Sequence, residues 1–497
     1  MNPARREQAA ALLREMMALR NDVLREGAHR FDRWRPTIQR REFCASALNL
    51  AQYLALRHRD VRRIQQALTP WGLSSLGRSE LHVLASLDAV IATLSALAGV
   101  PAPVEHPAMH RFMRGDRALQ RHINHFFGAA QRRRRVRIMV TMPTLAAEDA
   151  AFVHTLVERG MDIARINCAH DTPEAWGRMI AHVRRAESET GFACRIHMDL
   201  GGPKARTGAI LIPEKRRIYL NDRILLTRTP PQPLEEFPIQ VQSLLPEALD
   251  QVKLGQRVWI DDGKLGTEVE RILSDGVVLR VTQAEPDGVK LRTEKGLNFP
   301  DSDLSLNPLT QDDLEALDFI AEHADSIGYS FVQTREDVAL LQAELARRLP
   351  EKRARNIGIV AKIETQRALQ NLPEILIQAA GAQPFAVMIA RGDLAVEIGF
   401  ERLAEMQEEL LWVCEAAHVP VIWATQVLEN AVKKGRPSRA EMTDAAMSAR
   451  ADCVMLNKGD YVADALMVLD DVLRRMEGHQ IKKRAQLRAL RSWVDAE

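Results

Sequence analysis

Charged side chains follow two apolar runs in the second half of this 497-residue chain, and their spacing suits metal and phosphate chemistry. In the run IGIVAKIET, Lys362 and Glu364 stand two residues apart, so both side chains point to the same side of an extended strand. The next run ends in Arg391, Gly392 and Asp393. On adjacent parallel strands, about 4.8 Å apart, Glu364 and Asp393 could share one hard divalent cation such as Mg²⁺. The alternative is a structural Lys362–Glu364 ion pair beside a solvated aspartate.

Further basic side chains close other apolar runs and could complete a site for phosphate groups. Arg165 and Asn167 end the run DIARIN, and Asp199 ends CRIHMD just before the loop GGPKARTG, which contains Arg206. Cations around two metal-binding carboxylates suit phosphoryl transfer, because that catalysis consists mainly of positioning and of neutralising developing oxygen charge. The loop lacks the GxxxxGK[ST] pattern of a Walker A motif, so any phosphotransfer would use a different phosphate cradle.

These side chains need strands whose C-terminal ends meet, and the chain after residue 135 supplies eight apolar runs separated by helical stretches. The runs are RIMVTM, DIARIN, CRIHMD, DSIGYSF, IGIVAKIE, FAVMIAR, VPVIWATQ and DCVMLN. Eight alternations of strand and helix predict an α/β fold, a (β/α)8 TIM barrel, whose chemistry lies at the C-terminal strand ends. Between the third and fourth runs, alternating strands with Gly and Asp turns predict an inserted β-barrel lid domain.

The chain before residue 136 has helical periodicity and predicts an N-terminal all-helical domain. After a helix cap expected at Ser79, apolar residues recur at helical spacing: Leu84, Leu87, Ile91 and Leu94. The expected organisation is a helical domain (1–135), a TIM barrel (136–208 and 296–475), an inserted β lid (209–295) and a basic helical tail (476–497).

The amino-acid composition argues against some classes of binding partner. The 68 Lys and Arg residues nearly balance 66 Asp and Glu residues, so the net charge of +2 creates no general attraction for nucleic acid or anionic membranes. No uncharged apolar stretch of about 18 residues and no signal-peptide core occurs. Five cysteines without a CxxC pair fit a reducing compartment. We expect a cytoplasmic protein with small-molecule partners, without nucleic-acid or membrane partners, in which a homo-oligomer is left open.

Taken together, the motifs carry a family resemblance. ARIN with the following His170, DLGGPKARTG, WIDDG, EKGLNFP, AKIET, ARGDLAVEIG, WATQVLEN and RPSRAEMTDAA occur in the order found in pyruvate kinases. The chain resembles that family over about residues 136–475. The resemblance implies the family's barrel and lid, and transfer of phosphate from phosphoenolpyruvate to ADP, giving pyruvate and ATP. We expect the family's C-terminal effector domain to be missing, and the helical domain matches no family element.

The resemblance also implies roles for individual residues. For the reaction centre it implies a phosphoryl-stabilising lysine, a phosphate-binding arginine, a threonine near the protonation site and two ligands for Mg²⁺ or Mn²⁺: Lys362, Arg165, Thr425, Glu364 and Asp393. For the substrate it implies carboxylate-binding backbone amides and a fourth-strand side chain: Gly392, Asp393 and Ser330. For the nucleotide it implies contacts from barrel and lid: Pro143, Asn167, His170, Arg206, Asp262 and Lys295.

One departure from the family pattern concerns a monovalent-cation site. Many pyruvate kinases bind potassium through oxygens that would fall here at positions including Ala169 and Leu200, whose side chains cannot coordinate a cation. Lys204 stands where potassium-dependent relatives carry glutamate. We expect the Lys204 ammonium to take the cation's place and to pair with Asp199, so that no potassium is required.

A second departure leaves the activity open. After the eighth strand the chain reads MLNKGDY from Met455, whereas family members read MLSGETAKGDYP, so a loop that contributes to proton transfer and nucleotide binding is shorter. A catalytically impaired pyruvate kinase-like protein that binds phosphoenolpyruvate or nucleotide in a regulatory role is therefore the alternative to a pyruvate kinase-like phosphotransferase. A third hypothesis is another barrel enzyme acting on pyruvate enolate, such as an aldolase or lyase, and the nucleotide-facing residues count against it.

Overall fold

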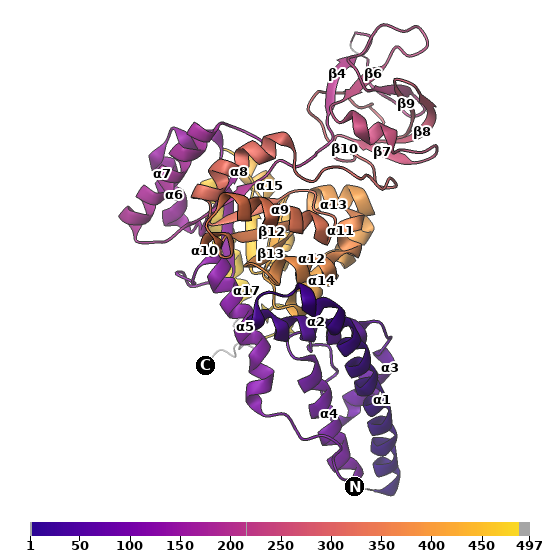
Figure 1. The fold of residues 1–497 in the computed structure, drawn as a ribbon, viewed down its shortest axis with the longest axis vertical. Helices are drawn as coiled ribbons and strands as arrows, with labels where there is room; N and C mark the ends of the chain where they lie inside the picture. The colour runs from indigo at the N-terminus through magenta and orange to yellow at the C-terminus, as the bar shows by residue number, and fades with distance from the viewer. Residues whose placement is uncertain (1, 215, 487–497) are drawn as a thin grey trace, which may run out of the picture.

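A computed structural model describes residues 2–214 and 216–486 of the chain. Figure 1 shows three bodies stacked along the longest axis of the molecule: the N-terminal helices at one end, a barrel in the middle and the inserted β domain at the other end. Within the described ranges, no helix combines the length and the apolar character needed to cross a membrane. The five cysteines, all inside these ranges, are free thiols.

Eight parallel strands form the closed barrel at the centre of the molecule. In barrel order they are β1 (Arg137–Thr141), β15 (Cys453–Leu456), β14 (Val421–Ala424), β13 (Phe385–Ala390), β12 (Gly358–Ile363), β11 (Ser326–Tyr329), β3 (Arg195–Asp199) and β2 (Ile163–Asn167). Every neighbouring pair is parallel, including β1 with β15, which closes the barrel. The predicted TIM barrel and all eight predicted strands are confirmed.

Helices around the barrel connect the strands. They are α6 (Ala150–Arg159), α7 (Pro173–Thr190), α8 (Gln311–His323), α9 (Arg335–Arg348), α10 (Glu351–Ala354), α11 (Gln366–Gln370), α12 (Leu372–Ala380), α13 (Arg391–Ile398), α14 (Phe400–Ala416), α15 (Glu429–Lys434), α16 (Arg439–Ser448) and α17 (Val462–Met476). Capping boxes at Thr310, Thr334 and Ser438 fix where α8, α9 and α16 begin. The loops between strand ends and helix starts are thereby held in place at the mouth of the barrel.

The inserted domain is a β structure with its own apolar core. Its strands are β4 (Thr207–Leu211), β5 (Arg223–Thr227), β6 (Gln240–Ser243), β7 (Arg257–Ile260), β8 (Leu265–Leu273), β9 (Gly276–Gln283) and β10 (Leu297–Asn298), in the sheet order β10-β7-β8-β9-β5-β6-β4. The two ends of the sheet meet, because Arg206 forms a bridge with Gly296 and the Leu297 amide donates to the Ala205 carbonyl at 2.9 Å. The domain is thus a small barrel that projects from the mouth of the TIM barrel (Figure 1).

Five helices precede the barrel. They are α1 (Pro3–Trp34), α2 (Cys44–Arg57), α3 (Arg62–Leu68), α4 (Val83–Ala98) and α5 (Met109–Phe127). The cap expected at Ser79 is wrong: α4 begins after His82, and the Ser79 hydroxyl donates instead to the Leu76 carbonyl at 2.8 Å. Ser79 is buried in a turn that precedes the helix, so its oxygen satisfies the turn and is not available to the helix amides.

The last turn of α5 closes the base of the barrel. Phe126 and Phe127 belong to one apolar cluster with inward-facing residues of the strands, among them Met139 of β1 and Met455 of β15. A Cβ atom on Gly358, the first residue of β12, would lie 2.6 Å from the Phe126 ring, so only glycine fits there. The N-terminal helices are therefore packed into the barrel at the end opposite the lid (Figure 1).

The basic tail differs from the predicted helix. Helix α17 ends at Met476, and the described part of the tail forms a short hairpin of β16 (Gln480–Ile481) and β17 (Arg484–Ala485). The hairpin is held by ion pairs: Lys482 Nζ lies 2.6 Å from Asp452 Oδ2, Lys483 pairs with Glu80, and Arg484 Nη1 lies 3.0 Å from Asp116 Oδ1. These long-range partners favour the turn over a helix. Residues 487–497 of the predicted tail lie outside the described residues.

Candidate active site

Lys362 and Glu364 stand together at the C-terminal end of β12, as their spacing predicts. Lys362 Nζ lies 3.1 Å from Glu364 Oε1, 2.8 Å from Ser330 Oγ and 3.9 Å from Asp199 Oδ2. The second Glu364 oxygen accepts a hydrogen bond from the Phe331 amide at 2.7 Å. A buried ammonium group is thus held by side chains from three adjacent strand ends.

The charged side chains of this cluster shift the pKa values of one another. Burial lowers the pKa of Lys362, but the carboxylates of Glu364 and Asp199 outweigh burial and bring the pKa above its ordinary value. Burial raises the pKa of Glu364, the Lys362 charge opposes that effect, and the charge of Asp393 adds to it. Lys362 is therefore a permanent cation at the floor of the barrel mouth.

Arg165, at the end of β2, is oriented by a buried hydrogen-bonded chain. Its Nε lies 2.8 Å from Asp199 Oδ2, and its Nη1 donates to Thr141 Oγ1 at 2.9 Å. The other oxygen of Asp199 lies 2.7 Å from Nε2 of His197, whose Nδ1 lies 2.9 Å from Ser326 Oγ. Burial would raise the pKa of Asp199, but Arg165, Lys362 and His197 hold that pKa well below its usual range. Asp199 is thus an anion that fixes the arginine.

Sequence reasoning did not single out His197. It is fully buried, and it lies two residues before Asp199 on the same strand, so both side chains point into the barrel. A histidine inside an otherwise apolar strand, two positions before a carboxylate, was the pattern that could have identified it.

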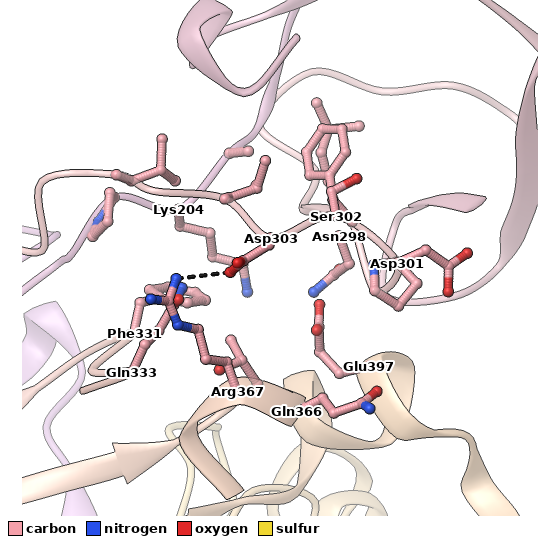
Figure 2. Close-up of a pocket in the computed structure, with 18 of the residues that line it drawn as sticks. Lys204, Asn298, Asp301, Ser302, Asp303, Phe331, Gln333, Gln366, Arg367 and Glu397 are labelled. Atoms are coloured by element: carbon pink, nitrogen blue, oxygen red, sulfur yellow. Dashed lines mark hydrogen bonds and ion pairs between the residues drawn. The ribbon is translucent and has the colours of Figure 1, made fainter. Parts of the chain in front are cut away.

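Lys204 does not pair with Asp199, which corrects the sequence-based prediction. Its Nζ lies 2.7 Å from Asp393 Oδ1, across the barrel mouth from the third strand to α13. The reason is that Asp199 is only 1% exposed and its two oxygens already bind Arg165 and His197. The ammonium of Lys204 instead reaches the open side of the mouth, where Figure 2 shows it extending into a cavity.

Thr425 follows β14 in a strained conformation that its neighbours maintain. Its φ is 63°, in the left-handed region that a β-branched residue rarely adopts. The Gly392 amide donates to Thr425 Oγ1 at 2.8 Å, and Arg391 Nη2 donates to the Thr425 carbonyl at 2.7 Å. Arg391 also forms a two-pronged ion pair with Asp444. The Gly392 amide, predicted to bind a substrate carboxylate, is therefore engaged with Thr425 in this structure.

The residues predicted to face a nucleotide come from the loops at the ends of β1, β2 and β3 and from the lid. Burial and the nearby charges of Lys458 and Arg206 lower the pKa of His170, which places these basic groups around one space. Asn167 accepts a hydrogen bond from the Ala169 amide at 3.2 Å, which shapes the loop after β2, and Pro143 begins the turn after β1.

The two lid residues of this set lie at the base of the inserted domain. Lys295 Nζ lies 3.3 Å from Asp261 Oδ1, and Arg206 Nη1 donates to the Glu294 carbonyl at 3.2 Å. A Cβ atom on Gly296 would lie 3.4 Å from an Asp262 oxygen and 3.2 Å from Lys204 Cε. Asp262 is therefore close to the barrel-mouth lysine, whereas Lys295 faces the neighbouring aspartate.

A cavity of about 660 Å³ opens between the lid base and the barrel, beside Lys204. In Figure 2, Asn298 and Asp303 approach it from the segment that leaves the lid, and Gln366, Arg367 and Glu397 approach it from the barrel helices. Arg367 Nη1 lies 2.7 Å from Asp303 Oδ1 across this cleft. The volume lies in the range of small-molecule sites.

The donor set for a divalent metal is two carboxylates. The charge of Asp393 acts on Glu364, so the two groups are near neighbours, and each has one lysine partner. Over the described residues, no cluster of three or more His, Cys, Asp or Glu side chains is arranged to hold a metal. Two anionic oxygen ligands with remaining positions for water and substrate oxygens fit Mg²⁺, which rarely occupies an all-protein cage.

Comparison with known proteins assigns the barrel to a family. Residues 133–466 match the family model described as pyruvate kinase, barrel domain. The chain is 32% identical over 356 residues to a pyruvate kinase of Dictyostelium discoideum, 34% identical over 337 residues to pyruvate kinase PKLR of Homo sapiens, and 32% identical over 357 residues to a pyruvate kinase of Geobacillus stearothermophilus.

These matches cover 69%, 65% and 69% of this chain and 66%, 56% and 57% of the respective relatives, so the chain spans about three fifths of the length of the relatives it matches. The matched region contains all eight barrel strands, the lid and each side chain of the cluster around Lys362. The barrel and its inserted lid thus identify the chain as a member of the pyruvate kinase family.

Proposed function

We propose that this protein transfers a phosphoryl group from phosphoenolpyruvate to ADP, giving pyruvate and ATP. The observation that carries the proposal is the cluster in which Lys362 of β12 and Arg165 of β2 present two cations on either side of Asp199, with Glu364 paired to Lys362, in a family barrel. Family membership makes this reaction the first candidate. The fixed cations supply the chemistry that phosphoryl transfer requires.

The protein's own groups divide the work between binding and charge neutralisation. Arg165, held by Asp199 and Thr141, is preorganised to bind the transferring phosphoryl group. Lys362 is placed to neutralise negative charge on the bridging and enolate oxygens. Thr425 Oγ1 accepts a hydrogen bond from the Gly392 amide, so its own hydroxyl group remains able to donate toward a bound enolate.

Glu364 and Asp393 would hold Mg²⁺, or Mn²⁺ in its place, because they are the two adjacent anionic oxygen donors at the mouth. When bound, the metal supplies charge neutralisation and orientation of phosphate oxygens. Lys204 pairs with Asp393 and Lys362 pairs with Glu364 in the present structure.

We also propose that the reaction needs no potassium. Two positions that would have to supply ligands, Ala169 and Leu200, carry no side-chain oxygen. The Lys204 ammonium stands on the third-strand loop and contacts Asp393, so a fixed positive charge is already present at the barrel mouth. Lys204 would take over the electrostatic role of the monovalent ion.

A coupled assay that measures pyruvate formed from phosphoenolpyruvate, ADP and Mg²⁺ tests the reaction. We expect turnover that depends on all three components and on Lys362. Absence of pyruvate formation from correctly folded protein, with each substrate at saturating concentration, would contradict the proposed activity.

The second candidate is an impaired family member that binds phosphoenolpyruvate or nucleotide in a regulatory role. The observation that favours it is the short connection after β15, where Asn457–Asp460 lead directly into α17. This candidate predicts saturable binding of phosphoenolpyruvate without pyruvate formation, so the same assay combined with a binding titration separates the two.

A further inference from the structure

A second cavity, of about 310 Å³, lies between the N-terminal helices and the base of the barrel. The helices that line it lie on the side of the barrel opposite the lid (Figure 1). Its walls are formed by α2, the start of α4 and α5, with His418 of the barrel at one side. Apart from His418, its lining falls outside the family-matched residues 133–466, so family membership assigns it no role.

Three arginines of α5 line this cavity. Arg111, Arg114 and Arg121 fall within about a quarter turn of one another on the helix. Gly115 and Ala118 lie on the same face, and a Cβ atom on Gly115 would meet the Leu81 carbonyl at 1.9 Å. Gly115 lets α5 pack closely against the turn before α4, and the three arginines lie along the same face of the helix.

These arginines have no carboxylate partner among the described residues. Of the acidic groups nearby, Glu42 pairs with Arg40 at 3.0 Å, and Asp116 pairs with Arg484 at 3.0 Å. No hydrogen bond or ion pair in the described part of the chain engages the guanidinium of Arg111, Arg114 or Arg121. Three exposed guanidinium groups therefore border one hollow whose lining contains a single carboxylate, Glu42, and this excess of positive charge favours an anionic occupant.

An amide side chain on α2 also lines this cavity. Gln52 of α2 is only 7% exposed and lines the cavity, and no group in the described ranges hydrogen-bonds to its side chain. The amide can therefore donate to or accept from a ligand in the cavity. Its neighbour Asn49, by contrast, is fully used: it donates to the carbonyls of Glu80 and Ala416 and accepts from the Val83 amide.

We propose that this cavity binds a small phosphate monoester. Guanidinium groups bind phosphate oxygens in paired hydrogen bonds, and three of them around one hollow match a dianionic group. The Gln52 amide can serve a hydroxyl on the organic part of the ligand. A volume near the lower limit of ligand sites suits a molecule of a few carbon atoms. The proposal does not depend on phosphotransfer at the barrel mouth.

The bound ligand would contact the helical domain beside His418, which lies just before a strand of the barrel. His418 Nδ1 lies 2.8 Å from Ser46 Oγ of α2, and the His418 carbonyl accepts a hydrogen bond from His122 of α5 at 2.6 Å. Three residues later β14 begins, and Thr425 follows its far end. A ligand that links α2 to α5 therefore acts on the segment that starts this strand.

Calorimetric titration with sn-glycerol 3-phosphate tests the site, with glycerol and inorganic phosphate as comparison ligands. The protein variants are the double change Arg114→Gln with Arg121→Gln, the matched control Arg117→Gln on the same helix but outside the cavity lining, and Arg165→Gln, which removes phosphate binding at the barrel mouth. Arg114, Arg117 and Arg121 are exposed, whereas Arg165 is buried, and circular dichroism checks that each variant folds.

We expect the wild type to bind sn-glycerol 3-phosphate. The Kd should change by no more than about twofold in Arg165→Gln and in Arg117→Gln, and it should rise about tenfold or more in the double variant. Glycerol should not bind, and inorganic phosphate should bind more weakly than the ester. Equal affinity in the double variant, loss of binding in Arg165→Gln alone, or no binding to the wild type would overturn the proposal. Inorganic phosphate binding as tightly as the ester would overturn the assignment to an ester.

Discussion

Turnover should depend most on the ammonium of Lys362. We expect Lys362→Met to lower kcat by about 10²- to 10³-fold while phosphoenolpyruvate still binds, because the positive charge matters most when charge develops on the transferring group. Steady-state kinetics and a binding titration measure the two effects. The exposed lid lysine Lys253, changed to Met, provides the control and should keep normal turnover. A Lys362→Met variant with near-normal kcat would remove this residue from the mechanism.

Lys204 should make the activity independent of monovalent cations. We expect the wild type to have similar initial rates in potassium and tetramethylammonium salts at matched ionic strength, which screens equally. Lys204→Glu should lose activity in tetramethylammonium and recover part of it in potassium, because the change removes the ammonium that contacts Asp393 and adds a cation ligand. Strong potassium stimulation of the wild type would contradict the prediction.

The sequence predicted those parts of the site that depend on local geometry. The two-residue spacing of Lys362 and Glu364 dictates a shared side of a strand, and the structure places them 3.1 Å apart. The partner of Lys204 could not be predicted in this way, because the choice between Asp199 and Asp393 depends on which carboxylate is already occupied. That occupancy is set by His197 and Arg165, which meet only in the closed barrel.

At the scale of elements, the lid is the first subject for experiment. Residues 209–295 can be replaced by a short glycine linker, because the Thr207 amide and the Lys295 carbonyl are hydrogen-bonded at 2.8 Å, so the two ends of the insert lie together. We expect a folded barrel by circular dichroism, with little phosphotransfer, since closure over a nucleotide excludes water. A Lys295→Ala variant that keeps the lid separates loss of the domain from loss of one charge. Full activity without the lid would refute its role.

The contact of α5 with β12 gives a second test at this scale. We expect Gly358→Ala to lower the free energy of unfolding by about 1–3 kcal/mol, because its Cβ atom would lie 2.6 Å from the Phe126 ring. Adding Phe126→Leu should restore part of the loss by giving that atom room. Chemical denaturation of both variants measures the effect. Unchanged stability of Gly358→Ala would mean that α5 can withdraw from the barrel.

Elements were predictable where the local pattern and the final environment agree. All eight barrel strands are buried apolar runs, and burial of that kind is visible in the sequence. The tail was not predictable, because its basic residues suit a helix locally but bind Asp452, Glu80 and Asp116 from distant parts of the chain. Long-range ion pairs of this kind leave no periodic pattern.

At the scale of the whole molecule, the junction of barrel, tail and N-terminal helices should make stability depend on pH. Burial raises the pKa of Glu415 to about 7; Lys482 and Arg484 oppose this, and Glu80 adds to it. Between about pH 4.5 and 7 the native carboxyl holds a proton that the unfolded chain has released. The free energy of unfolding therefore falls as the pH rises through this window and levels off above it.

We expect Glu415→Gln to remove this pH-dependent loss of stability. As the pH rises from 4.5 to 8, the free energy of unfolding of the variant should therefore increase relative to that of the wild type by on the order of 3 kcal/mol. Denaturant unfolding at several pH values measures the difference. The exposed Glu409 on the same helix, changed to Gln, should leave the profile unchanged. Parallel profiles for wild type and Glu415→Gln would contradict the buried-carboxyl interpretation.

The aromatic end of α5 also has a consequence for how the chain is made. Phe126 and Phe127 leave the ribosome before any barrel strand, yet their cluster includes Cys453 and Met455 on the last strand. Contacts between such distant segments slow folding, and until β15 is synthesised these rings have no complete apolar environment. Nascent chains halted before the eighth strand should therefore expose these rings to chaperones and to the rings of other nascent chains. Burial of an early segment thus has to wait for the last strand of the barrel.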